Sequence, residues 1–363
     1  MFRWPPTLDA SPILSAKKLV NTSQVRRAFA AELVSHLEQH GFARLRNYGV
    51  APHTTRVLFN YHYLFFNLSL IAKLSVRHPG GEAPARGYSP WIYEKTAIVR
   101  PDLHDAPNLN TFSSPHSHLF EVSTGSSKAQ SLAARERFAI GPPGDYSFPT
   151  PQLAEALLPG FNRTTRGIYL KIIKACNMLL DTIELGLDVP PGTLNPLDTG
   201  GLGTELNLNF YPEVARDRID GGGGDDVAMY RILPHLDLGV ISALFQDGAG
   251  ASGLELEVRG LGKGRCEFAP VFVEQEGDVV LLVSDTLERW TNGRLRAALH
   301  RVALPPEAGT SRVPERRSAV MFLRPPPTAD IGPKPQFVSA DNPALYDHIT
   351  AGDYLRLSNK KLY

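Results

Sequence analysis

Between residues 205 and 325, short β-rich runs follow one another with turns between them and no helical segments. These runs lie at 206–211, 230–234, 240–245, 254–258, 271–274, 279–283, 299–304 and 318–322. In 206–211, polar and apolar residues alternate, which is typical of a strand with two different faces. Closely spaced strands without intervening helices favour an antiparallel barrel or sandwich.

One pair of residues in this region has the chemistry of a metal site. His235 and Asp237 are separated by one residue, so on a strand both side chains would point to the same side. His300, from a later strand, would complete a set of two imidazoles and one carboxylate. Such a set suits Fe(II) and leaves the opposite face of the ion open. A His-x-Asp pair alone is weak evidence, because it occurs by chance in most chains of this length.

The segments around these residues strengthen the hypothesis, because their order is that of a known family. The segments are His235-Leu236-Asp237-Leu238-Gly239, Arg289-Trp290-Thr291-Asn292-Gly293-Arg294, His300-Arg301-Val302 and Arg316-Arg317-Ser318-Ala319-Val320-Met321-Phe322-Leu323. They resemble the Fe(II)- and 2-oxoglutarate-dependent dioxygenases, in the branch similar to isopenicillin N synthase. The resemblance implies a mainly β fold with α additions: a double-stranded β-helix (jelly roll) flanked by N-terminal helices and a long central helix.

The resemblance also implies three cofactors or cosubstrates: Fe(II), 2-oxoglutarate and O2. The distal carboxylate of 2-oxoglutarate needs a counter-charge, and arginine fits because its fork pairs with both carboxylate oxygens. The family uses an Arg-x-Ser pair on a late strand, which Arg316 and Ser318 match, with Arg317 on the other face. Similarly, Tyr211 resembles the tyrosine of the family's Asn-x-Tyr, which donates to the same carboxylate, and Asn209 would lie near the C1 end.

The activity that the resemblance implies is oxidation of an unactivated C–H bond in a small organic molecule. Hydroxylation is the expected outcome, with release of succinate and CO2, in specialised metabolism. An oxidase of the same fold that uses no 2-oxoglutarate would not require the group formed by Arg316, Ser318 and Tyr211. A non-catalytic ligand-binding protein would be expected to have lost a metal ligand. The substrate itself does not follow from the sequence.

Apolar residues at helical spacing predict three helices, at 25–39, 52–76 and 161–187, and the segment 345–361 looks like a C-terminal helical tail. Thr22 and Ser23 are candidate caps of the first helix, and a short strand at 42–46 follows it. The irregular stretch 89–151 predicts loops over the mouth of the barrel. We divide the chain into an N-terminal region with lid loops, a jelly-roll core with its packing helix and a C-terminal tail, at 1–150, 151–330 and 331–363.

Two other features could bind ligands, and both have simpler interpretations. His116 and His118 form a second candidate metal pair, but no third ligand lies at suitable spacing, so an exposed loop that touches substrate is favoured. Glu121 lies where the family often has an acidic residue, with no defined role. The glycine run 221–224 lacks the lysine and helix of a phosphate cradle, so it predicts a flexible loop.

The composition gives no sign of a highly charged or membrane-bound partner. The 363 residues include 38 basic and 37 acidic ones, so no electrostatic pattern indicates nucleic acid or a membrane surface. No signal peptide or membrane span is recognisable. Only Cys176 and Cys266 are present, which fits a reducing cytosol and predicts a cytoplasmic protein. We expect a small-molecule substrate and either a monomer or a homodimer.

Overall fold

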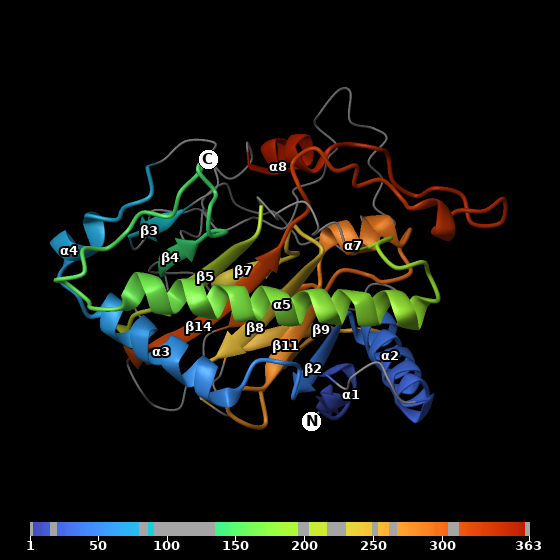
Figure 1. The fold of residues 1–363 in the computed structure, drawn as a ribbon, viewed down its shortest axis with the longest axis horizontal. Coiled ribbons are helices and arrows are strands. Elements are labelled where there is room, and N and C mark those ends of the chain that lie inside the picture. The colour runs from blue at the N-terminus through green and yellow to red at the C-terminus, as the bar shows by residue number, and fades with distance from the viewer. Residues whose placement is uncertain are drawn as a thin grey trace, which may run out of the picture.

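The computed structural model describes residues 3–14, 20–79, 86–90, 135–194, 203–215, 230–248, 253–260, 267–303 and 312–359. Its largest sheet has the strand order β1-β2-β11-β8-β14-β5-β4-β3 (Figure 1). The bounds of these strands, in that order, are Leu8–Asp9, Phe42–Arg46, Val279–Val283, Ile241–Gln246, Arg316–Leu323, Glu205–Tyr211, Glu136–Ile140 and Gly87–Ser89. Neighbouring strands pair antiparallel, except for the parallel pair of β1 and β2.

A second sheet of four antiparallel strands has the order β10-β9-β12-β7. Its strands are Glu267–Pro270, Leu254–Val258, His300–Ala303 and Tyr230–His235. Leu254 and Leu256 of this sheet share one buried cluster with Leu244, Val280 and Val320 of the large sheet. The two sheets therefore enclose a core between them, which confirms the predicted double-stranded β-helix. A further small pair joins β6 (Val214–Ala215) and β13 (Arg312–Val313).

Helices cover the other face of the large sheet. The long helix α5 (Phe161–Leu187) runs across it, beside α3 (Pro52–Phe66) and α2 (Val20–His40) (Figure 1). Leu208 and Met321, on the helix side of the sheet, belong to the same core cluster as the buried residues of α5. The flanking residues Gly160 and Asp188 adopt left-handed backbone conformations, which end the helix on both sides. The predicted helix at 161–187 is confirmed.

The remaining helices correct three predictions. The helix predicted at 52–76 is wrong, because α3 ends at Phe66 and a separate α4 (Leu70–Leu74) follows. The Ser69 side chain accepts a hydrogen bond from the Ala72 backbone at 3.3 Å and so caps this new start. Helix α2 begins at Val20, so Thr22 and Ser23 lie inside it and are not caps. The C-terminal helix α8 (Ala351–Asn359) begins at Ala351 and not at the predicted residue 345.

Two strand predictions also need correction. The segment 271–274 forms no strand, and β10 lies immediately before it. Val271 and Val273 are buried in the core between the sheets, so their β-branched character reflects burial and not ladder pairing. Within 89–151, predicted as loops, β4 pairs with β5 along its full length.

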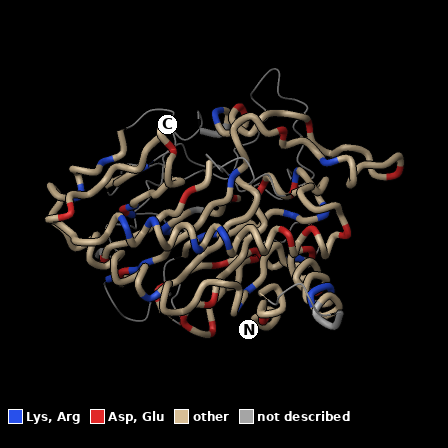
Figure 2. The backbone as a smooth tube through the Cα atoms, in the orientation of Figure 1, with Lys and Arg blue, Asp and Glu red and all other residues tan. Residues whose placement is uncertain are grey.

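Charges of both signs are distributed along the elements of both sheets and the helices (Figure 2). Among the described residues, no helix has the length and apolar character needed to cross a bilayer. The division of the chain at residues 150 and 330 stays a prediction.

Candidate metal and cosubstrate site

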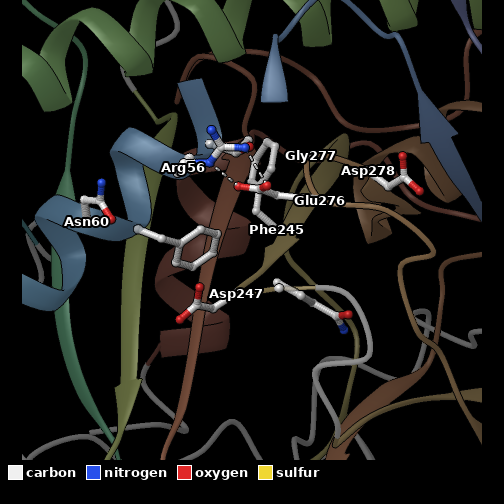
Figure 3. Close-up of a pocket in the computed structure, with 11 residues that line it drawn as sticks. Arg56, Asn60, Phe245, Asp247, Glu276, Gly277 and Asp278 are labelled. Carbon is white, nitrogen blue, oxygen red and sulfur yellow. Dashed lines mark hydrogen bonds and ion pairs between the residues drawn. The ribbon is translucent and has the colours of Figure 1, made fainter. Parts of the chain in front are cut away.

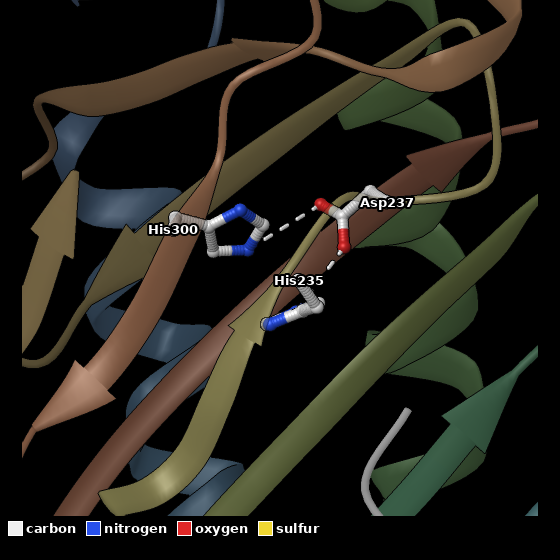
Figure 4. A group of neighbouring side chains, drawn as sticks. All are labelled: His235, Asp237 and His300. Carbon is white, nitrogen blue, oxygen red and sulfur yellow. Dashed lines mark ion pairs between the residues drawn. The ribbon is translucent and has the colours of Figure 1, made fainter. Parts of the chain in front are cut away.

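Two histidines and one aspartate converge between neighbouring strands of the small sheet (Figure 4). The antiparallel register of β7 and β12 places His300 directly opposite His235, and their ring centroids lie 4.2 Å apart. Asp237 Oδ1 is 3.6 Å from His235 Nε2, and Asp237 Oδ2 is 3.8 Å from His300 Nε2. Each residue can offer one ligand atom to a common point, since these atoms lie within 4.8 Å of one another.

Asp237 does not lie on the strand, in contrast to the prediction from residue alternation. Strand β7 ends at His235, and Asp237 belongs to the turn that leads into β8. Backbone hydrogen bonds hold this turn against α7 (Asp285–Trp290): Asp285 N–H donates to the Asp237 carbonyl at 3.0 Å and Thr286 N–H to the Gly239 carbonyl at 2.7 Å. The carboxylate therefore lies beside the imidazoles because the chain turns after the end of β7, and not because side chains alternate along a strand.

The turn also depends on a residue without a side chain. A Cβ at Gly239 would lie 2.6 Å from the Leu323 carbonyl oxygen. We expect Gly239→Ala to reduce the free energy of unfolding by about 1–3 kcal/mol, because backbone atoms must move apart. Chemical denaturation measures this change. Gly167→Ala is the matched control, because Gly167 lies in α5 with no atom close to its added Cβ. Equal stability of the two variants would contradict the close packing of the turn.

The hydrogen bonds of the site define the form of the second histidine. His300 Nδ1 lies 3.0 Å from the Ala298 carbonyl oxygen, which can only accept, so Nδ1 carries the proton. Nε2 of the neutral ring is then free of a proton and is the nitrogen nearest to Asp237. Asp237 Oδ2 is buried and accepts no hydrogen bond within the described part of the chain. A buried anionic oxygen beside two imidazole nitrogens fits a divalent cation, which would satisfy it.

A second polar group lies on the inner face of the large sheet, where β5 pairs with β14. Arg316 lies opposite Tyr211, and Ser318 lies opposite Asn209. Arg316 Nη1 donates to Ser318 Oγ at 3.0 Å, and the guanidinium carbon is 5.2 Å from the centre of the Tyr211 ring. Burial lowers the pKa of Arg316 from its ordinary value, because the charged form loses its hydration. The Asn209 Oδ1 atom is buried without a hydrogen-bond partner in the described chain.

Known proteins resemble this chain in sequence along nearly its whole length. Residues 6–143 match the model described as "non-haem dioxygenase in morphine synthesis N-terminal", and residues 205–325 match the 2OG-Fe(II) oxygenase superfamily. A 2-oxoglutarate-dependent dioxygenase of Penicillium fellutanum, phqC, is 35% identical over 96% of this chain and 92% of its own length. The 2-oxoglutarate-dependent dioxygenase ecdK of Aspergillus rugulosus is 33% identical over 93% of this chain and 95% of its own. The chain belongs to the 2-oxoglutarate- and Fe(II)-dependent oxygenase superfamily.

Solved structures support the fold of this oxygenase. Neurospora crassa T7H, in complex with alpha-KG and thymine, has a TM-score of 0.74 at 24% identity and covers 98% of this chain and 96% of its own. A putative 2OG-Fe(II) oxygenase family protein from Caulobacter crescentus has a TM-score of 0.65 at 23% identity, over 93% and 95% of the two chains. The predicted family, the branch similar to isopenicillin N synthase, and the use of Fe(II), 2-oxoglutarate and O2 are confirmed.

A cavity of about 270 Å³ lies at the C-terminal end of β8 (Figure 3). The turn of residues 236–240, which carries Asp237 and is called the metal-site turn below, leads into the other end of this strand. The cavity shares no residue with the three convergent side chains or with the group around Arg316. Arg56 forms two hydrogen bonds with Glu276, at 2.8 and 2.7 Å, and Asp278 is bound by Arg46. The charges in its wall are therefore largely neutralised by protein partners. For this reason the cavity is a weaker candidate for a ligand site than the three convergent side chains.

Two arginines near the site make contacts that the sequence did not predict. Arg324 donates through Nε to the Leu238 carbonyl at 3.0 Å and pairs with the buried Glu205 at 3.0 Å, so it ties the metal-site turn to β5. Arg231 on β7 approaches Tyr211 from the small sheet. Neither contact is part of a sequence motif, and both depend on how the strands pack.

Several predicted features lie outside the described residues. They are His116, His118, Glu121, Cys266 and the glycine run 221–224. Cys176 is buried in α5.

Proposed function

We propose that His235, Asp237 and His300 hold Fe(II) and that Arg316, Ser318 and Tyr211 bind the distal carboxylate of 2-oxoglutarate. Asn209 would lie near the C1 end of the cosubstrate. The observation that carries the proposal is the convergence of three potential ligands, from two strands and a turn, within 4.8 Å. The second support is a buried guanidinium, hydroxyl and phenol grouped on the inner face of the neighbouring sheet.

Each residue has a defined task in this proposal. Asp237 supplies the anionic oxygen, and the Ala298 carbonyl fixes the His300 ring so that Nε2 is the available donor. Arg316, held by Ser318, orients the cosubstrate by its distal end so that its keto acid end can reach the metal. When bound, Fe(II) supplies the activation of O2 that couples oxidative decarboxylation of 2-oxoglutarate to oxidation of the substrate.

The reaction that we propose is hydroxylation of an unactivated C–H bond in a small organic molecule. One oxygen atom of O2 enters succinate, the other enters the product, and CO2 leaves. The similarity to fungal 2-oxoglutarate-dependent dioxygenases favours a tailoring step in specialised metabolism. An oxidase that does not use 2-oxoglutarate would not require a buried arginine beside the metal site.

The test is substrate-dependent formation of succinate. The purified, iron-loaded protein is supplied with 2-oxoglutarate and a library of small metabolites, and succinate and the oxidised product are measured in parallel. We expect at least one metabolite to raise succinate formation above the rate without substrate, in equimolar ratio with its product. Product formation that continues after 2-oxoglutarate is omitted would contradict the proposal and favour the oxidase.

A further inference from the structure

Two buried arginines from the two different sheets approach one tyrosine ring. Arg231, on β7 of the small sheet, has only 5% of its surface exposed, and its guanidinium carbon is 5.5 Å from the centre of the Tyr211 ring. Arg316, on β14 of the large sheet, is 5.2 Å from the same centre. Tyr211 is itself buried in a small cluster with Ile232 and Val302. The two cations therefore share a desolvated space inside the barrel.

Among the described residues, no carboxylate compensates the charge of Arg231. Burial, followed by the charge of Arg316, lowers the pKa of Arg231 to about 10, and Tyr211 acts in the opposite direction. Within the described residues, its one hydrogen bond is from Nη2 to the neutral carbonyl oxygen of Pro314. Two like charges in a desolvated space repel strongly, and a bound anion would relieve that repulsion.

The position of Arg231 makes one anion the natural ligand. Its Nη2 donates to the Pro314 carbonyl, its Nε and Nη1 make no hydrogen bond within the described residues, and Arg316 approaches the same tyrosine ring. A carboxylate has about four acceptor sites and can receive bonds from two guanidinium groups and a phenol together. The distal carboxylate of 2-oxoglutarate is the anion that the proposed function already places beside Arg316.

We propose that Arg231 is a second cationic residue of the cosubstrate site and binds the distal carboxylate together with Arg316. The inference rests on the proposed function. It deepens that function by making the pocket selective for a charged distal end, since an uncharged end would leave the repulsion between the two buried arginines uncompensated. An uncharged keto acid of the same length should therefore bind far more weakly than 2-oxoglutarate.

The test compares two keto acids of equal length. 2-Oxoglutarate and 2-oxopentanoate share the metal-binding end, and only the first has a distal carboxylate. Calorimetric titration of the Mn(II)-loaded protein gives both dissociation constants without turnover, and their ratio measures the contribution of the distal carboxylate. We expect Arg231→Met to reduce this ratio by about 10- to 100-fold, as expected for loss of a charge-assisted hydrogen bond in a buried site. Changes in folding or metal content cancel in the ratio.

Controls separate the charge of Arg231 from its bulk. Arg317→Met removes another buried arginine, on the opposite face of β14 against the rings of Tyr63 and Phe210, and should leave the ratio unchanged. Arg231→Lys keeps the charge but loses the fork, so its ratio should lie between those of the wild type and Arg231→Met. If the methionine variant does not fold, a lysine variant with the ratio of the wild type overturns the inference.

The possible outcomes separate failure of the inference about Arg231 from failure of the proposed function. If Arg231→Met weakens both keto acids by the same factor, Arg231 has a structural role and the inference is wrong, while the proposed function stands. If the Mn(II)-loaded wild type binds neither keto acid, both the inference and the proposed function are wrong.

Discussion

Replacement of His235 or Asp237 by Ala is expected to abolish substrate-dependent succinate formation. Each change removes one of three ligand atoms that lie within 4.8 Å of one another. Loss of an outer hydrogen-bond partner of a metal ligand typically costs about 10- to 100-fold in metal affinity, so loss of a ligand should cost more than about 100-fold. Titration with Mn(II), followed by calorimetry, measures the affinity independently of turnover.

The matched control for this prediction is His348→Ala. His348 also lies beside an aspartate, with Nδ1 2.6 Å from Asp330 Oδ2, but this pair lies in the C-terminal segment and is largely exposed. Metal affinity and turnover should stay at the level of the wild type in this variant. A His235→Ala protein that still bound Mn(II) as tightly as the control would disprove the assignment of the metal ligands.

Arg316→Met is expected to raise the KM for 2-oxoglutarate by about 100-fold and to change kcat much less. In the proposed function, the guanidinium holds the distal end of the cosubstrate and the metal holds the reacting end, so the loss should fall mainly on binding. A 100-fold change corresponds to about 3 kcal/mol, which is the upper value for a hydrogen bond to a charged group. Succinate formation at a series of 2-oxoglutarate concentrations gives both constants.

Arg317→Met serves as the control within the same strand. Arg317 is also buried, but it lies on the face that packs against α3, where it contacts Tyr63. We expect its loss to affect stability and to leave the KM unchanged. If Arg317→Met raised the KM as much as Arg316→Met, the side chain alternation along β14 would not define the cosubstrate site.

Much of the fold was predictable because its signals are local. The alternation in 206–211 and the nearly continuous apolar spacing of 161–187 encode a strand and a helix that the structure confirms. The alternation also places Arg316 and Ser318 on one face and Arg317 on the other, as the structure has them. The order of the segments around His235, Asp237 and His300 was enough to predict the family. Several such segments in the same order are much more specific for one family than a His-x-Asp pair alone.

Other features depend on contacts that alternation does not encode. The turn that carries Asp237 is fixed by the start of α7 and by Arg324, and these elements are distant in sequence. The chain divides into α3 and α4 where the Ser69 side chain caps the start of α4, although the apolar spacing continues on both sides of this position. Residues 271–274 have strand-like composition but form no strand, and only Val271 and Val273 among them are buried.

The sequence by itself determined which side chains could form a metal centre and which face of its strand each cosubstrate residue occupies. Only the tertiary structure decided that Asp237 reaches the histidines from a turn and that Arg231 and Arg316 approach the same ring of Tyr211. The physical reason is that residue periodicity specifies the direction of a side chain on its own element. The partner that it meets depends on how two sheets pack, and no local pattern contains that information.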